Sequence, residues 1–169
     1  TFKVFADCLA TNGSIKAIVA PGLAGMTRKE IDALTDFAKK HGAKGLVNLK
    51  YKDGALTGPI VKFLSEEEVA TTVAALQLKE NDLVLIVSDK WRNTCEVLGA
   101  LRNHLGERLG YRNKSEFSFL WVTDFPMFEY DEETQRYYAM HHPFTRPKES
   151  DLDKIDTDPA NCLADAYDI

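Results

Sequence analysis

The apolar run Leu83-Val84-Leu85-Ile86-Val87 is the strongest structural signal in the first two thirds of the chain. A continuous run of this length is typical of a strand that is buried on both faces. Ser88 or Asp89 follows as a candidate helix cap, and Gly110 stands where a helix commonly ends. Between them, apolar residues at helical spacing predict a helix with the stripe Trp91, Cys95, Leu98, Leu101, Leu105 and Leu109.

Two further helices are predicted from their first residues. Thr27-Arg28-Lys29-Glu30 and Ser65-Glu66-Glu67-Glu68 both have the capping-box pattern, in which a hydroxyl caps an amide and a glutamate three residues later reaches back. Gly42 is expected to end the first of these helices.

Further strands complete the expected fold of this part of the chain. Asn12-Gly13 and Asp53-Gly54 are typical of tight hairpin turns. Four apolar runs predict the strands, at residues 2–10, 14–20, 45–51 and 59–64. We therefore predict an α+β fold, with helices packed on a mainly antiparallel sheet.

The composition limits the classes of protein to which the chain can belong. It has 169 residues, of which 44% are hydrophobic and 28% are charged, and a formal net charge of −5. An acidic chain is poorly suited to nonspecific phosphate binding, so DNA is not an expected partner. Three cysteines without a CxxC pattern predict free thiols in a reducing cytoplasm. No apolar run has the length of a membrane span, and no signal peptide is visible.

Residues 117–145, FSFLWVTDFPMFEYDEETQRYYAMHHPFT, place polar and titratable groups within aromatic sequence. Such groups are costly in an apolar strand pair unless they are used, so this stretch predicts a small-molecule site. Its pattern predicts a long strand over 117–128, an acidic turn over 130–135 and a returning strand over 137–140. Residues 146–161 are polar and predict a solvated loop that lacks the glycine and glutamate of an EF-hand.

His141 and His142 are the candidate binding residues. Pro143 favours extended backbone at His142, and adjacent extended residues point to opposite faces, so at most one ring is expected to face a given pocket. From the residues alone, a structural pair is the better interpretation, as is a turn role for Asp124.

Asp168 is either an ordinary strand residue or one member of a carboxylate pair that holds Mg²⁺. His41 and His104 are interpreted as helix-surface residues. No phosphate-binding glycine loop or nucleophile arrangement is present, so no catalytic residue is predicted.

Three motifs resemble those of bacterial-type aspartyl-tRNA synthetases, a family of class II aminoacyl-tRNA synthetases. They are LWVTDFPMFE at 120–129, AMHHPFT at 139–145 and AYD at 166–168. Residues 1–112 resemble the insertion domain, or GAD domain, that these enzymes carry. Residues 113–169 resemble part of their catalytic domain. The resemblance therefore implies an α+β insertion domain followed by a strand pair from a class II catalytic sheet.

The resemblance also implies a reaction and its site. These enzymes activate L-aspartate with ATP and transfer it to the 3′ end of tRNA. In such an enzyme, His141 would contact the amino acid, His142 would support the same loop, and Asp168 would lie near ATP and Mg²⁺. An imidazole suits this role because it donates to a carboxylate or accepts from an ammonium group. The parent enzyme is expected to be a cytoplasmic homodimer that needs no membrane.

Both ends of the sequence predict a fragment. Thr1 stands where an initiator methionine would, and the last residues enter an apolar run. The arginine motifs with which class II enzymes grip ATP have no match here, so we expect the isolated fragment to bind no cofactor and to be inactive. An alternative is that the insertion domain acts as an autonomous module that binds tRNA or a protein. A third interpretation, an unrelated α+β domain with a chance HHPFT motif, is disfavoured.

Overall fold

The computed structural model describes residues 2–167. The chain divides into two compact units, Thr1–Lys114 and Ser115–Ile169. The sequence predicted a domain boundary between residues 112 and 113. Each unit has a hydrophobic core of its own.

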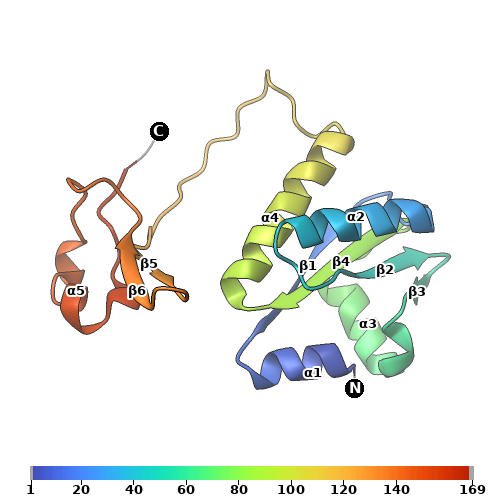
Figure 1. Ribbon diagram of the computed structural model, residues 1–169. Coiled ribbons are helices and arrows are strands. Elements are labelled where there is room, and N and C mark those ends of the chain that lie inside the picture. Colours follow the sequence, from blue (N-terminus) through green and yellow to red (C-terminus); the bar gives the residue numbers. More distant parts are fainter. Residues whose placement is uncertain (1, 168–169) are drawn as a thin grey trace. The chain divides into compact units, whose positions relative to one another are not determined.

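A four-stranded sheet organises the first unit (Figure 1). In spatial order the strands are β1 (Ser14–Ala20), β4 (Asp82–Asp89), β2 (Val47–Lys52) and β3 (Ala55–Thr57). β4 pairs antiparallel with both β1 and β2, and β3 pairs antiparallel with β2. The prediction of an α+β fold with a mainly antiparallel sheet is confirmed.

β4 is buried along its length because both faces of the sheet are covered. Successive side chains of a strand point to opposite faces. Leu83, Leu85 and Val87 belong to one core, whereas Val84 and Ile86 belong to the other. None of these five side chains is more than 7% exposed. The continuous apolar run at 83–87 is therefore a buried strand, as predicted.

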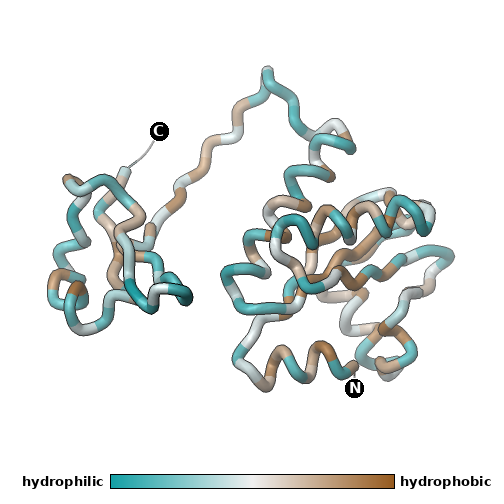
Figure 2. Tube along the Cα trace, viewed as in Figure 1, coloured by the Kyte–Doolittle hydropathy of each residue, from teal (hydrophilic) through white to brown (hydrophobic). Residues whose placement is uncertain are grey.

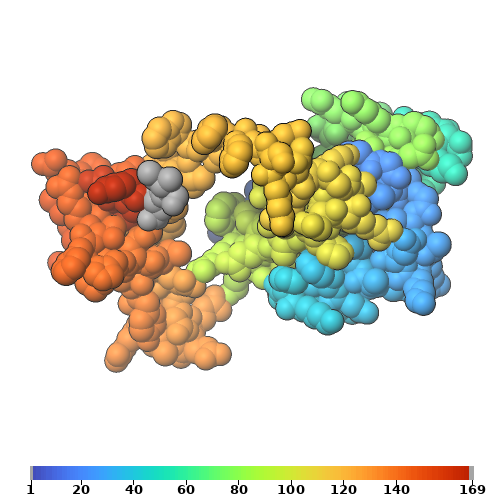
Figure 3. Space-filling view, turned by 90° about the horizontal axis from the view of Figure 1, so that it is seen from above, coloured from blue at the N-terminus to red at the C-terminus, as the bar shows by residue number. Residues whose placement is uncertain are grey.

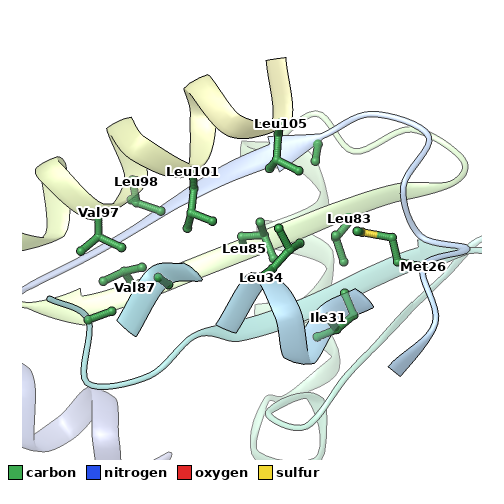
Figure 4. Packing of buried hydrophobic residues seen from close by; sticks show 13 residues of the cluster. Met26, Ile31, Leu34, Leu83, Leu85, Val87, Val97, Leu98, Leu101 and Leu105 are labelled. Carbon is green, nitrogen blue, oxygen red and sulfur yellow. The ribbon is translucent and has the colours of Figure 1, made fainter. Parts of the chain in front are cut away.

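Two pairs of helices cover the two faces (Figure 1). Helices α2 (Arg28–Lys40) and α4 (Trp91–Arg108) pack on the first core, where Leu34 and Leu101 meet the side chains of β4 (Figure 4). Helices α1 (Lys3–Ala10) and α3 (Glu66–Ala75) contribute Phe5 and Val73 to the second core. Figure 2 shows apolar residues along the central strands and alternating apolar and polar residues along α2 and α4.

The local signals for α2, α3 and the β2–β3 turn are confirmed. The backbone N–H of Thr27 donates to the Glu30 carboxylate at 2.9 Å, and the Thr27 hydroxyl accepts from the Glu30 N–H at 3.3 Å. Ser65 and Glu68 form the same reciprocal pair at the start of α3. The dipeptide Asp53-Gly54 takes positive φ at both residues, as a two-residue hairpin turn requires.

Several predictions for the first unit are wrong. Residues 3–10 form helix α1 instead of a strand, so Asn12-Gly13 joins a helix to β1 and makes no hairpin. Phe2 and Phe5 pack edge to face, with 5.0 Å between ring centres, and reach the second core. Residues 59–64 contain the 3₁₀ helix η1 (Val61–Phe63).

The beginning of α4 also differs from the prediction. Its N-cap is Lys90, and no side chain caps the helix there. Trp91, the first residue of the predicted stripe, is 65% exposed, whereas Thr94 and Val97 are fully buried. Gly110, with φ of 71°, follows the helix as predicted.

The second unit is built around the hairpin β5 (Phe128–Asp131) and β6 (Arg136–Ala139). Its core contains Met127, Cys162 and Ala164. Short helical turns follow, at η2 (Glu149–Asp151), α5 (Lys154–Thr157) and η3 (Pro159–Asn161). The hairpin confirms the separate strand pair, with a returning strand close to where it was predicted.

The predicted long strand over 117–128 is wrong. Residues 117–125 pair with no strand among the described residues. Phe119 and Trp121 are 96% and 93% exposed, and Figure 3 shows in gold the segment to which they belong. An aromatic and apolar sequence therefore occurs here without the partner strand that would bury it.

Two class predictions concern the whole chain. Cys8, Cys95 and Cys162 are free thiols, as expected. Within residues 2–167, no helix has both the length and the apolar character needed to cross a membrane.

Candidate functional site

Residues 162–165 lie at the centre of the candidate site because they bond to two other segments of the second unit. Isolated β-bridges join Leu163 to Pro126 and Ala164 to Pro147. Four backbone hydrogen bonds of 2.7–2.9 Å support these bridges. The N–H groups of Met127 and Ala164 donate to the carbonyl oxygens of Cys162 and Phe125. Those of Lys148 and Asp165 donate to the carbonyl oxygens of Leu163 and Arg146. The DFPM segment at 124–127, the segment after HHPFT and the residues before AYD are thereby joined.

Asp124 strengthens this junction. It has a left-handed backbone, with φ of 62°, a conformation that aspartate tolerates better than most residues. Its carboxylate accepts from Lys148 Nζ at 2.6 Å and from the Thr123 hydroxyl at 3.1 Å. The hydrogen bond from Lys148 is the main reason that the pKa of Asp124 lies below its ordinary value. Asp124 therefore ties two motifs together, beyond the turn role predicted for it.

His141 contacts the DFP segment. Its Nε2 lies 3.0 Å from the carbonyl oxygen of Pro126, and its ring meets that of Phe125 edge to face at 6.0 Å. A carbonyl oxygen only accepts, so Nε2 must carry the proton in this contact. In the neutral ring, Nδ1 then remains as a hydrogen-bond acceptor.

His142 has different partners from His141. Its Nδ1 accepts from the backbone N–H of Phe144 at 3.3 Å, and the two rings lie 4.8 Å apart. Because Nδ1 accepts, the proton of the neutral ring resides on Nε2. The His142 side chain is exposed, so this Nε2–H group is accessible.

The two imidazoles thus offer complementary groups. His141 Nδ1 accepts a hydrogen bond, whereas His142 Nε2–H donates one. An amino acid carries both an ammonium donor and a carboxylate acceptor. The pair is therefore equipped to contact such a ligand. In each ring, one nitrogen contacts a backbone group, and this contact sets the tautomer and thus the role of the second nitrogen.

The predicted metal ligand, Asp168, lies outside the described residues. Of the acidic residues just before it, Asp165 is engaged by Arg146, whose Nη2 lies 2.8 Å from its carboxylate. Residues 2–167 contain no group of three or more His, Cys, Asp or Glu side chains placed to hold a metal ion. The described residues alone do not fit a Mg²⁺ site, and the role of Asp168 stays a prediction.

Asp151 is a structural residue that the sequence analysis missed, because it placed residues 146–161 in a solvated loop. Asp151 is only 4% exposed. Its carboxylate accepts from the Leu163 N–H at 3.0 Å and pairs with Lys154 at 2.9 Å. The hydrogen bond that Lys154 donates is the main reason that the pKa of Asp151 lies below its ordinary value. The i, i+3 spacing of this pair was the only local signal for it.

The first unit contains a separate aromatic cluster. The ring of Phe37 lies 4.3 Å from that of His41 and 4.5 Å from that of His104. His41 follows α2 directly, and its Nδ1 lies 2.9 Å from the Phe37 carbonyl oxygen. α2 and α4 enclose a cavity of about 410 Å³ beside this cluster. Both histidines are exposed on helix surfaces, as expected from the sequence, and their ring contacts with Phe37 were not predicted.

Comparison with known proteins identifies a family and several relatives of this chain. Residues 5–98 match the family model described as GAD domain. The chain is 49% identical over 168 residues to the aspartate–tRNA(Asp/Asn) ligase of Geotalea uraniireducens, which covers 99% of this chain and 28% of that protein. It is 50% identical over 169 residues to the aspartate–tRNA ligase of Staphylococcus epidermidis, covering 99% of this chain and 29% of that protein.

The aspartate–tRNA ligase of Listeria monocytogenes is 48% identical over 169 residues, again 99% of this chain and 29% of the relative. The chain thus spans less than a third of the length of these relatives. The matched region extends through both units. The resemblance to aspartyl-tRNA synthetases is confirmed, and the chain belongs to the GAD domain family.

Proposed function

We propose that this chain is part of an aspartate–tRNA ligase. In this proposal, residues 1–112 are the insertion domain, and residues 113–169 contribute one wall of the amino-acid pocket in the catalytic domain. The observation that carries the proposal is the pair of imidazoles at His141 and His142, which present one acceptor and one donor within the HHPFT motif, a motif that resembles that of the ligase family.

The reaction assigns these residues a binding role. A carboxylate oxygen of L-aspartate attacks the α-phosphorus of ATP, and pyrophosphate leaves. A hydroxyl at the 3′ end of tRNA then attacks the acyl carbon, and AMP leaves. His141 and His142 hold the amino acid during the first step, and no residue of this chain takes part in bond formation or cleavage.

The rest of the parent enzyme supplies what the chain does not contain. Asp168 is the residue of this chain that would help to hold Mg²⁺, which when bound would orient the phosphates of ATP and neutralise their charge. The parent acts as a homodimer in the cytoplasm. The isolated chain is inactive, because it lacks the groups that stabilise the charge of the reacting phosphate.

ATP–pyrophosphate exchange tests the proposal. In the full-length protein that carries this chain, His141→Ala and His142→Ala are each expected to raise the KM for L-aspartate about tenfold or more, since each removes a contact to the substrate. The KM for ATP should change much less. His104→Ala, which lies in the other unit, is the matched control and should leave both constants unchanged.

Two results would contradict the proposal. One is an unchanged KM for L-aspartate in both variants with a native circular dichroism spectrum. The other is exchange above background with the isolated 169-residue chain, which would show that the chain carries a complete catalytic site.

A second candidate function is an interaction module formed by the first unit. Its two cores support an independent fold. Two of its lysines are already engaged, however, as Lys44 pairs with Asp89 at 3.0 Å and Lys50 donates to the Met26 carbonyl at 2.6 Å. Titrating tRNA onto the chain at several salt concentrations tests this function, since phosphate contacts give a steep salt dependence.

A further inference from the structure

A groove runs between the edge of the sheet and α4 in the first unit. β1 and the C-terminal half of α4 enclose a cavity of about 300 Å³. Its apolar lining comes from Ile18 and Ala20 of β1 and from Leu105 and Leu109 at the end of α4. The lining also includes Arg102 and Arg112. The site is thus a largely apolar hollow with two arginines in its lining.

β1 offers an unpaired edge beside this cavity. It is the first strand in the spatial order of the sheet, and among the described residues it pairs with β4 alone. The backbone N–H and C=O groups on its other side therefore have no strand partner within residues 2–167. A free edge of this kind is a template for an additional extended chain.

Gly106 leaves room in the groove. It lies in α4 and lines the cavity. A Cβ atom added at Gly106 would meet no atom within 4 Å. Glycine lowers the stability of a helix interior, yet here its missing side chain keeps the cavity open.

Exposed aromatic and basic groups also lie near the two ends of α4. Trp91 at the start of α4 is 65% exposed, and the Nζ of Lys16 on β1 lies 6.0 Å from its ring centre. Tyr111, which also lines the cavity, is 65% exposed. Arg102 has no ion-pair partner among residues 2–167, and Arg112 shares its charge with Glu107 at 3.1 Å.

We propose that this groove binds an extended acidic peptide. The peptide adds a strand to the free edge of β1, inserts one apolar side chain into the cavity, and presents carboxylates to Arg102, Arg112 and Lys16. The positive charges of Arg102, Arg112 and Lys16 favour acidic peptides over basic ones. A peptide fits better than RNA, because only a peptide offers the backbone N–H and C=O groups that complete a strand pair.

Selection from a phage library of random nine-residue peptides on the 169-residue chain tests the proposal. Each enriched sequence is then measured as a fluorescein-labelled synthetic peptide by fluorescence anisotropy. The expected sequences carry an apolar residue with aspartate or glutamate within about three positions, since that spacing spans the cavity and its boundary at about 3.3 Å per extended residue.

Matched variants of α4 separate specific binding from unfolding. Gly106→Leu fills the cavity and is expected to weaken binding about tenfold or more. Gly99→Leu is the control, because Gly99 also lies in α4 with open space at its Cβ but does not line the cavity. It should change the affinity by less than about twofold. Both variants should keep or raise the melting temperature, since leucine favours a helix over glycine.

The charge of Arg102 gives a second test. Arg102→Gln is expected to lower the affinity about threefold to tenfold and to reduce its salt dependence. The proposal is overturned if no peptide is enriched, if the enriched peptides are basic, or if Gly106→Leu leaves the affinity unchanged. It is also overturned if Gly106→Leu abolishes self-association or tRNA binding instead, because a second copy of the chain or an RNA would then occupy the groove.

Discussion

Replacing Leu101 with alanine tests whether the packing of α4 on the sheet stabilises the first unit. Leu101 is fully buried in the core that also contains Leu85 and Val97. Alanine favours a helix as much as leucine does, so the effect reports packing and not helix propensity. Buried Leu→Ala substitutions cost about 2.7–5.0 kcal/mol, because the transfer free energy and the residual cavity both contribute. We expect a loss of about 3–4 kcal/mol.

The assay combines urea and thermal unfolding with hydrogen exchange. At about 4 °C per kcal/mol for a unit of this size, the melting temperature should fall by roughly 10–20 °C. Amides of β4 should lose protection, whereas the Met127 and Ala164 amides, which bond within the second unit, should not. Leu9→Ala is the control, because Leu9 lies in α1 and is 61% exposed. A loss below about 1 kcal/mol for Leu101→Ala, or an equal loss for Leu9→Ala, would refute the reasoning.

Two further predictions concern a helix cap and a buried carboxylate. Thr27→Ala should lower the free energy of unfolding by about 1 kcal/mol, because it removes the oxygen that caps the Glu30 amide. Thr71→Ala, at an exposed position in α3, should change it by less than about 0.5 kcal/mol in the same urea titration. Asp89 has a pKa below its ordinary value, because burial is outweighed by hydrogen bonds from Lys44, the Lys90 amide and Asn93. Its stabilising effect is therefore present above the unfolded-state pKa of about 3.9 and is lost as the pH falls through the folded-state pKa. The stability difference between Asp89→Asn and the natural chain should shrink on acidification, and a difference that grew would contradict the ion-pair role.

The elements that were predicted correctly have signals within a few residues. The capping boxes at Thr27 and Ser65 depend on a residue three positions later. The turn at Asp53-Gly54 depends on two residues that tolerate positive φ. The run at 83–87 depends only on its own apolar side chains. In each case the local preference and the tertiary environment agree.

The errors occur where the same local pattern suits two structures. Phe2 to Phe5 alternate as a strand does, yet α1 places Phe2 and Phe5 together against the second core. Residues 117–122 are also rich in aromatic and apolar residues that favour strands, but no strand pairs with them among the described residues. A short apolar run carries no information about which distant segment will cover it.

The candidate site shows the same division. The HHPFT and DFP motifs identified the region and the residues His141 and His142. Their tautomers, and the junction that Asp124 and Lys148 form, required the folded chain. Asp151 could not be recognised as buried, because its burial depends on Leu163, twelve residues away.

Short-range chemistry in this chain was enough to predict the antiparallel α+β class, two helix starts and the family motifs, because hydrogen bonds between near neighbours and apolar periodicity are written in consecutive residues. Which segments meet was settled by folding alone. The helical state of α1, the convergence of 124–127 with 146–148 and 162–165, and the free edge of β1 beside α4 all arise from contacts between residues distant in the chain. Such contacts depend on the packing of the whole unit, and no single segment encodes them.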